Sequence, residues 1–328
     1  RARVVVLTVP WALRQQGGYP LWQPVPGLTP DQATLAARVA EWHARGLRVW
    51  LMPVLVWEPG PVARWWGDEA PDFMWWQAWY ERLEEWLVGL GDLATRIKTD
   101  GLIVSTYGFE PSLRPHTRLP SGALAHPPAD AQARWSSLLQ QLRQVYHGPL
   151  WWTPGPTQGP DTTWLQVADG IVLTITPQDN PADVAEPTVE TYVQALSEVL
   201  ATRIEPWVKT EKPILIQLAL PSAQGVQTGC IQPINAISTN PPPCLPPETL
   251  TLGQPGADQV AVDLDAQRLL YNAWLLTIHQ TPHIQGVISA GFYPYVAYQG
   301  PSASIYAKPA YDVVRFWYEH WQPPTQHP

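Results

Sequence analysis

The sequence predicts an α/β fold of the (β/α)8 TIM-barrel type, in which parallel strands alternate with helices. Strand-like apolar runs alternate with helical patterns along all 328 residues, the runs are continuously apolar, and no Gly-rich phosphate loop follows any of them. Continuously apolar strands are typical of a parallel sheet that helices cover. A doubly wound sheet is the alternative, and the missing phosphate loop weighs against its nucleotide-binding versions.

The first elements show the pattern most clearly. An apolar run at residues 3–11 predicts the first strand. A helix is predicted at residues 29–46, because Thr29 suits the N-cap, Pro30 suits the first helical position and Gly46 suits the end. A strand, a helix and a strand are then expected at residues 47–57, 70–97 and 101–110.

The rest of the chain continues the alternation. Further strands are predicted at residues 149–156, 170–180, 212–222 and 285–295. Further helices are predicted at residues 129–148, 163–169, 187–208, 263–281 and 308–321. Seven strands are thus readable where a barrel of this type has eight. We therefore expect the first strand and helix to lie upstream of Arg1.

One barrel domain is expected at residues 1–321, followed by a tail at residues 322–328. A Pro-rich loop at about residues 223–258 interrupts the alternation and contains both cysteines, Cys230 and Cys244. A disulfide that closes a loop of about fifteen residues stabilises a protein by roughly 3 kcal/mol. Such a bond predicts an oxidising compartment, outside the cell or on its surface. Two free buried thiols are the alternative, and the absence of nearby histidines argues against a zinc site.

Charge and hydropathy weigh against several kinds of partner. The net charge is −8, and the 20 Lys and Arg residues are scattered without a basic run. Nucleic acid and anionic membrane surfaces are therefore poor partners. The longest apolar run, near residues 48–57, is about half as long as a bilayer span, so no membrane span is expected.

Aromatic composition points to carbohydrate. The chain has 19 Trp and 12 Tyr but only 4 Phe. Trp and Tyr combine a flat apolar face with a polar edge, which suits sugar rings and their hydroxyl groups. A polysaccharide or oligosaccharide is therefore the expected partner. Some of the tryptophans recur at helical spacing and are interpreted as core instead: Trp75, Trp76, Trp79 and Trp86.

Candidate site residues lie at the carboxyl ends of the predicted strands, where barrel enzymes build their active sites. The carboxylates there are Glu58, Glu110 and Asp179. The aromatic residues expected to contact sugar are Trp11, Trp57, Tyr107, Trp152, Tyr293 and Tyr295. Paired carboxylates are what glycoside hydrolysis requires, and Glu110 is the expected proton donor. No His, Asp or Glu group has metal-ligand spacing, so neither a metal nor another cofactor is expected.

Three segments, taken in order, are similar to a known family. They are TPDQATLAARVAEWHARGLRVWLMPVL, WWQAWYERLEEWLVGLGDLATRIKTDGLIVSTYGFE and EKPILIQLALPSA. Together with the segments between and after them, they resemble glycoside hydrolase family 113, the endo-β-mannanase-type TIM barrels, over nearly the whole chain. The family reads Gly-Thr-Glu-Leu where this chain reads Gly108-Phe109-Glu110-Pro111. The resemblance therefore implies that Glu110 is the acid/base.

Two positions depart from the family pattern. The resemblance places the nucleophilic glutamate at Leu218, with Gln217 beside it, and neither side chain can attack an anomeric carbon. The residue before the acid/base is Phe109, where related barrels keep a polar residue that contacts sugar. Asp179 and Glu58 are the weaker candidates for the missing base or nucleophile.

The sequence leaves two functions open. The first is a glycoside hydrolase-like barrel that acts on a β-linked polysaccharide. The second is a barrel without catalysis that serves as a carbohydrate-binding or structural module on the cell surface, and the missing carboxylate at Gln217 and Leu218 supports it. Each carboxylate also has a simpler interpretation. Glu110 can be a solvated loop acid or an ion-pair partner of Arg114, and Asp179 or Glu58 can be a capping or salt-bridging acid.

Overall fold

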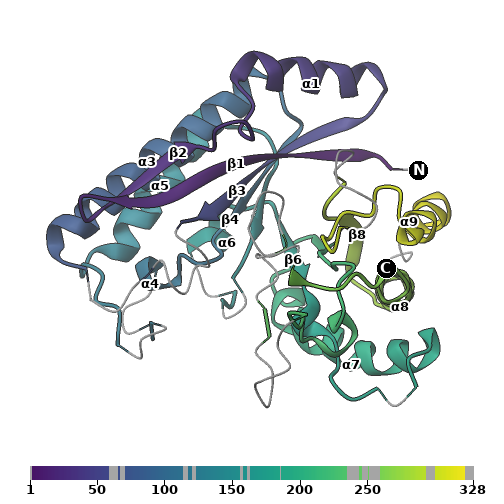
Figure 1. The fold of residues 1–328 in the computed structure, drawn as a ribbon. Helices are drawn as coiled ribbons and strands as arrows, with labels where there is room; N and C mark the ends of the chain where they lie inside the picture. Colours follow the sequence, from purple (N-terminus) through teal and green to yellow (C-terminus); the bar gives the residue numbers. More distant parts are fainter. Residues whose placement is uncertain are drawn as a thin grey trace. The chain divides into compact units, whose positions relative to one another are not determined.

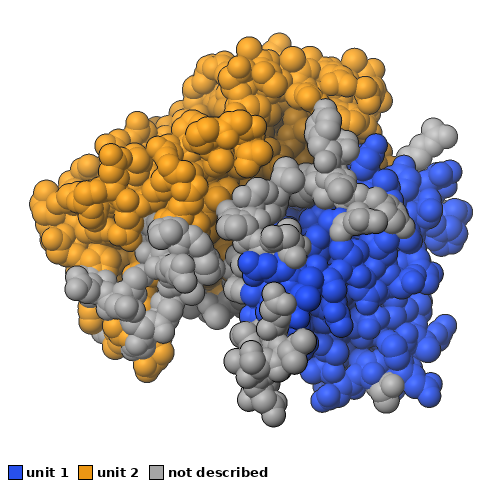
Figure 2. Space-filling view, viewed as in Figure 1, with its two compact units in different colours: residues 1, 172–328 blue, residues 2–171 orange. Residues whose placement is uncertain are grey.

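The protein divides into two compact units in the computed structural model, one formed by residues 2–171 and the other by residue 1 with residues 172–328 (Figure 2). The structure describes residues 2–58, 66, 71–113, 117–119, 123–155, 158–160, 163–184, 186–234, 244–245, 250, 259–292 and 300–321. The single domain expected at residues 1–321 stays a prediction, and the tail at residues 322–328 lies outside the described residues.

Eight strands form one sheet in the order β2-β1-β3-β4-β5-β6-β7-β8. Their bounds are β1 Val4–Gln16, β2 Tyr19–Pro24, β3 Arg48–Trp57, β4 Gly101–Ser105, β5 Leu150–Thr153, β6 Gly170–Ile175, β7 Ile214–Leu218 and β8 Ile284–Ser289 (Figure 1). All seven predicted strands are present. The pairings described among them are parallel, which confirms the mostly parallel sheet of the predicted fold class.

The eighth strand, β2, is a finding that the sequence interpretation missed. It pairs with β1 in antiparallel register, from Trp11 opposite Pro24 to Gln16 opposite Tyr19. The two strands are joined by Gly17 and Gly18, whose φ angles of 57° and 83° are left-handed. A two-residue turn with both φ angles positive matches the twist of a hairpin and favours glycine. The Gly-Gly pair was the available signal.

Helices alternate with the strands, as predicted. They are α1 Gln32–Ala44, α3 Phe73–Arg96, α4 Glu110–Leu113, α5 Ala131–Val145, α6 Thr163–Val167, α7 Val189–Val208, α8 Leu264–Gln280 and α9 Pro309–His320. Two 3-10 turns, η1 Pro177–Asp179 and η2 Val226–Thr228, complete the described elements. By the criterion of length and apolar character, none of the described helices is able to cross a membrane.

The start of α1 differs from the prediction. Asp31 is the N-cap, and its side chain accepts a hydrogen bond from the backbone N–H of Thr34. Thr29 lies before the helix, where its hydroxyl accepts from Val25 N–H and donates to the carbonyl of Pro10. The choice of Thr29 as N-cap was therefore wrong, because Thr29 uses its hydroxyl to tie the preceding loop to β1.

The tryptophans that recur along α3 fill the core of the unit at residues 2–171. All are at most 7% exposed: Trp75, Trp76, Trp79 and Trp86. Trp22, from the hairpin strand β2, packs against them with its ring centroid 4.9 Å from that of Trp79. The interpretation of this tryptophan series as core is confirmed.

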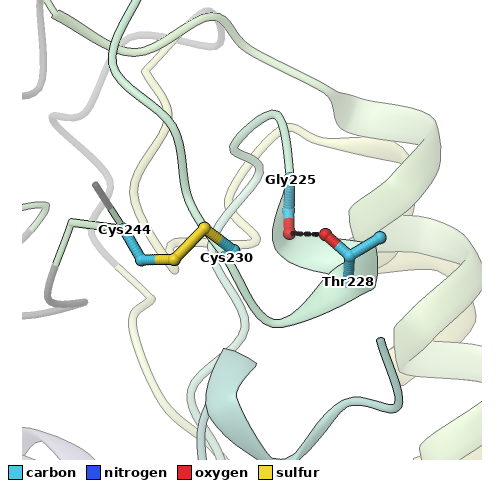
Figure 3. Close-up of a disulfide and its surroundings, with 4 residues drawn as sticks. All are labelled: Gly225, Thr228, Cys230 and Cys244. Atoms are coloured by element: carbon cyan, nitrogen blue, oxygen red, sulfur yellow. Dashed lines mark hydrogen bonds between the residues drawn. A yellow bond between two sulfur atoms is a disulfide. The ribbon is translucent and has the colours of Figure 1, made fainter. Parts of the chain in front are cut away.

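Cys230 and Cys244 form the predicted disulfide, in the unit at residues 172–328 (Figure 3). Just before Cys230, Gly225 starts the turn η2 with a φ of 85°, and its carbonyl accepts from the Thr228 hydroxyl. A Cβ on Gly225 would lie 2.0 Å from the carbonyl oxygen of Cys230. A small buried cluster lies around the bond: Ala223, Ile231, Leu250 and Val260, with Leu245 partly buried against it. The disulfide therefore clamps a segment that has its own packed residues.

A buried lysine joins the segment that follows β7 to the start of α9 in the same unit. Lys308, the N-cap residue of α9, is 3% exposed. Its Nζ donates to Ser222 Oγ at 2.8 Å, to the Gly300 carbonyl at 2.7 Å and to the Ser302 carbonyl at 3.0 Å. Burial lowers the pKa of Lys308 to about 8. Three neutral oxygens thus satisfy its three possible donors.

Candidate active site

Glu110 follows β4 across a tight turn. The strand ends at Ser105, and Phe109 N–H then donates to the Thr106 carbonyl at 3.0 Å. Gly108 lies in this turn with a φ of 82°, a conformation that favours glycine. Its carbonyl accepts from the indole Nε1 of Trp66 at 2.8 Å. Glu110 is therefore the first residue of α4 rather than the last residue of a strand, because the chain turns after Ser105.

Phe109 anchors this turn in the core. Its side chain is fully buried, with ring centroids of Trp57, Trp79 and Trp135 at 6.0, 5.5 and 6.2 Å. Aromatic pairs at such distances add to the free energy that burial contributes. The departure from the family pattern at position 109 therefore has a packing reason. Phe109 fixes the backbone that carries Glu110.

The carboxyl group of Glu110 lies against Gly155, which follows β5. A Cβ built on Gly155 would be only 1.9 Å from Glu110 Oε1. Any larger residue at position 155 would thus displace the carboxyl. Burial raises the pKa of Glu110, and the backbone N–H groups of Glu110 and Gly108 offset part of this rise because they stabilise the charged form. A carboxyl that keeps its proton to higher pH is suited to general acid catalysis.

Gln158 completes the surroundings of Glu110, and sequence reasoning found neither Gln158 nor Gly155. The Gln158 side-chain oxygen accepts from the Gly155 N–H at 2.7 Å and from the Thr106 hydroxyl at 2.5 Å. Trp152 Nε1 donates to the same hydroxyl at 2.9 Å. A glycine just after a strand often marks a close backbone approach, and that was the one signal for Gly155.

The predicted sugar-contacting aromatics differ in exposure. Tyr107 is 38% exposed and Trp11 is partly buried, whereas Trp57 is 7% exposed and Trp152 is fully buried. Tyr293 and Tyr295 lie outside the described residues. Only an exposed ring face can stack on a sugar, so Tyr107 and Trp11 have the surface that this role needs, while Trp57 and Trp152 contact protein.

Glu58 is engaged in an ion pair. Its carboxylate bonds the guanidinium of Arg14, which projects from β1, and its N–H donates to the Leu13 carbonyl at 2.9 Å. The two charged side chains are 31% and 41% exposed. The simpler interpretation of Glu58 as a salt-bridging acid thus has a named partner, and a catalytic role for Glu58 would require Arg14 to move or to act with it.

Asp179 caps the 3-10 turn η1, to which it belongs. Its side chain accepts from the Thr176 N–H at 2.8 Å and from the Thr176 hydroxyl at 3.1 Å, which caps η1. It belongs to the unit at residues 172–328, whereas Glu58 and Glu110 belong to the unit at residues 2–171. The capping interpretation of Asp179 therefore has direct geometric support.

Strand β7 has no carboxylate in its sequence, IleLeuIleGlnLeu. The side chain of Leu218 is fully buried. The Gln217 side-chain oxygen is buried and has no hydrogen-bond partner among the described residues. Neither residue can serve as a nucleophile. In the part of the chain that the structure describes, no three His, Cys, Asp or Glu side chains are grouped so that they could hold a metal ion.

No protein-family model matches this chain, and no curated protein matches it in sequence. Solved structures do match. A structure titled as a complex of a GH113 β-1,4-mannanase has a TM-score of 0.64 and 15% identity, over 97% of this chain and 88% of that one. The GH113 β-mannanase AaManA from Alicyclobacillus acidocaldarius, in complex with ManMIm, has a TM-score of 0.64 and 20% identity, over 97% of this chain and 87% of that one. The chain therefore has the fold of GH113 β-mannanase structures, the family that its sequence resembles.

Proposed function

We propose that this protein is a glycoside hydrolase that acts on a β-linked polysaccharide, with Glu110 as the proton donor. The observation that carries the proposal is the position of the Glu110 carboxyl, desolvated beyond the carboxyl end of β4 and pressed against Gly155. The shared fold with β-mannanase structures supports the same conclusion, since enzymes of this architecture act at that end of the strands.

The chemistry needs a protonated acid beside the scissile bond. A glycosidic oxygen leaves readily only when it gains a proton as its bond to the anomeric carbon breaks. The raised pKa of Glu110 keeps that proton available at higher pH than an exposed glutamate would. The second carboxylate is left unassigned, with Asp179 and Glu58 as the candidates. Retaining enzymes need it about 5 Å from the acid and inverting enzymes need it about 6.5–9.5 Å away.

Turnover of β-linked glycans tests the proposal. The purified protein is incubated with β-1,4-mannan and with other β-linked glucans and galactans, and new reducing ends are counted. Glu110→Gln is expected to lower kcat about 10²- to 10⁴-fold, because it keeps the shape but removes the acid. Glu198→Gln, an exposed position in α7, is the matched control and should match wild type. Unchanged turnover in Glu110→Gln would refute the assigned role.

A second function is kept because of β7. That strand has Gln217 and Leu218 where the resemblance expects the nucleophile, which favours a carbohydrate-binding module without catalysis. Such a module would bind oligosaccharide with no turnover in wild type, and binding would weaken in Tyr107→Ala. Calorimetric titration of mannan and cellulose oligosaccharides, run beside the turnover assay, separates the two functions.

We also place the protein outside the cell or on its surface. The disulfide between Cys230 and Cys244 supports an oxidising compartment, because such bonds are rare in the reducing cytosol. A polysaccharide partner is consistent with that location. Fractionation of the native source, with the redox state of the two cysteines measured in each fraction, tests the placement. Reduced cysteines in a cytosolic fraction would contradict it.

A further inference from the structure

Next to Glu110 lies a series of hydrogen bonds in which each donor and each acceptor can be assigned. The indole N–H of Trp152 donates to Thr106 Oγ1 at 2.9 Å, and the Thr106 hydroxyl donates to Gln158 Oε1 at 2.5 Å. The Gly155 N–H donates to the same oxygen at 2.7 Å. Indole and backbone N–H groups are donors only. The Thr106 hydroxyl, which accepts from Trp152, therefore passes its own hydrogen onward, and the amide oxygen of Gln158 must be the acceptor.

This direction determines which end of the Gln158 amide is unsatisfied. If the oxygen and nitrogen of the amide were swapped, its N–H would point at the Gly155 N–H, which is also a donor. Nε2 must therefore face away from Gly155 N–H. Nε2 is buried and has no hydrogen-bond partner among the residues that the structure describes, and Gln158 as a whole is 9% exposed. A buried donor without a partner destabilises the folded protein, because it has lost its hydrogen bonds to water. A group that accepts from this N–H would recover that free energy.

The carboxyl of Glu110 faces the same glycine as this amide. A Cβ on Gly155 would lie 1.9 Å from Glu110 Oε1 and 3.6 Å from the side-chain carbon Cδ of Gln158. Both side-chain ends therefore lie over the Cα of Gly155. Backbone N–H groups of Gly108 and Glu110 stabilise the carboxylate only in part, since burial still raises its pKa. A further hydrogen-bond donor would stabilise the carboxyl most strongly once it has lost its proton and become charged.

We propose that Gln158 is a positioning residue for Glu110. Its amide oxygen holds the turn that keeps Gly155 against the carboxyl. Its amide N–H, which makes no hydrogen bond to Glu110 in this structure, becomes a donor to the carboxylate that remains after Glu110 has given up a proton, directly or across one water molecule. The proposal rests on the role of Glu110 as proton donor. Since Nε2 is buried, it assigns Gln158 no contact with substrate.

The protonation equilibrium of Glu110 tests this inference without any turnover. Glutamate side-chain carboxyls are labelled with ¹³C, and the signal of Glu110 is identified as the one that Glu110→Gln removes. Its pKa is then measured in wild type, Gln158→Met and Gln158→Glu. Gln158→Met removes the donor without adding charge, and Gln158→Glu keeps the oxygen acceptor that Thr106 and Gly155 use. Gln158→Met should raise the pKa of Glu110 by about one unit, as expected when a charge-stabilising hydrogen bond is lost. Gln158→Glu should raise it further, because the new carboxyl adds like-charge repulsion to that loss.

Controls separate this inference from a purely structural role. Gly159→Ala, in the same loop but with open space around its Cβ, should leave the pKa of Glu110 unchanged. If the protein turns over glycan, Gln158→Glu should lower kcat with little change in KM. It should also shift the basic limb of the pH dependence of kcat/KM to higher pH. A pKa of Glu110 equal to that of wild type in folded Gln158→Met overturns the proposal. If Gln158→Met does not fold, Gln158→Leu, which also removes the donor without adding charge, takes its place. Absence of wild-type turnover would defeat the proposed function but leave the titration informative.

Discussion

The Glu110 carboxyl occupies space that only a glycine at position 155 leaves open. Gly155 is buried, and the hydrogen bond from its N–H to Gln158 holds it there. Its value to the site is thus steric, because a side chain of any size would push the carboxyl out of its place. This close approach ties the position of the proposed proton donor to a residue 45 places further along the chain.

Gly155→Ala is expected to abolish most turnover while the protein stays folded. The new Cβ would lie 1.9 Å from Oε1, so the carboxyl must move, and a misplacement of about 1 Å can cost roughly 10²-fold in rate. Gly159→Ala is the matched control, because nothing lies within 4 Å of its Cβ. Steady-state kinetics and circular dichroism on both variants provide the check. Equal rates in the two would show that the packing of the carboxyl is unimportant.

Burial of Glu110 also predicts a pH-dependent stability. Because its folded pKa is raised above the ordinary value of 4.5, the folded protein binds the proton more tightly than the unfolded chain does. The stability that this group contributes is present below pH 4.5 and is lost as pH rises through the folded pKa. Glu110→Gln should therefore gain free energy of unfolding relative to wild type between pH 4 and pH 7. Urea denaturation of both proteins at pH 4 and at pH 7 tests this. A difference in the free energy of unfolding that is the same at the two pH values would contradict it.

Among the elements, strands were more predictable than their ends. Each of the seven predicted strands is an apolar run that is recognisable from sequence because the sheet buries it. The short hairpin strand β2 reads TyrProLeuTrpGlnPro and has no such run, so it was missed despite Gly17 and Gly18. Several predicted strands were too long, as at Ser105, because the turn that follows depends on the left-handed Gly108 and on the burial of Phe109. The first strand was instead predicted too short, since β1 continues to Gln16.

The lysine at the start of α9 gives a prediction at the same scale. The folded pKa of Lys308, about 8, lies below its ordinary value of 10.5, so the unfolded chain binds this proton more tightly. Stability should therefore rise as pH increases from about 8 towards 10.5. Lys308→Met should lack this rise and should be less stable overall, since the carbonyls of Gly300 and Ser302 lose a donor. Thermal unfolding across pH 7.5–10.5 is the measurement, and parallel curves for the two proteins would contradict the account.

For the whole molecule, the order of the predicted elements and of the family-like segments along the chain was more informative than any single motif. Alternating apolar runs and helical patterns predicted the fold class, and the sequence of segments predicted the likeness to GH113 structures. The site was less predictable, because its contacts join residues far apart in sequence. Glu110 was predicted as a candidate from its place after a strand, but its packing against Gly155 and the orientation of Gln158 depend on how two neighbouring strands place their loops.

The central claim is that Glu110 donates the proton in hydrolysis of a β-linked glycan. The most direct measurement compares the pH dependence of kcat/KM on β-1,4-mannan with the pKa of the ¹³C-labelled Glu110 carboxyl in the free protein. The account predicts that activity falls at high pH with the pKa of Glu110, and that this limb disappears with the activity in Glu110→Gln. Turnover that persists in Glu110→Gln, or a basic limb more than one unit away from the pKa of Glu110, would contradict it.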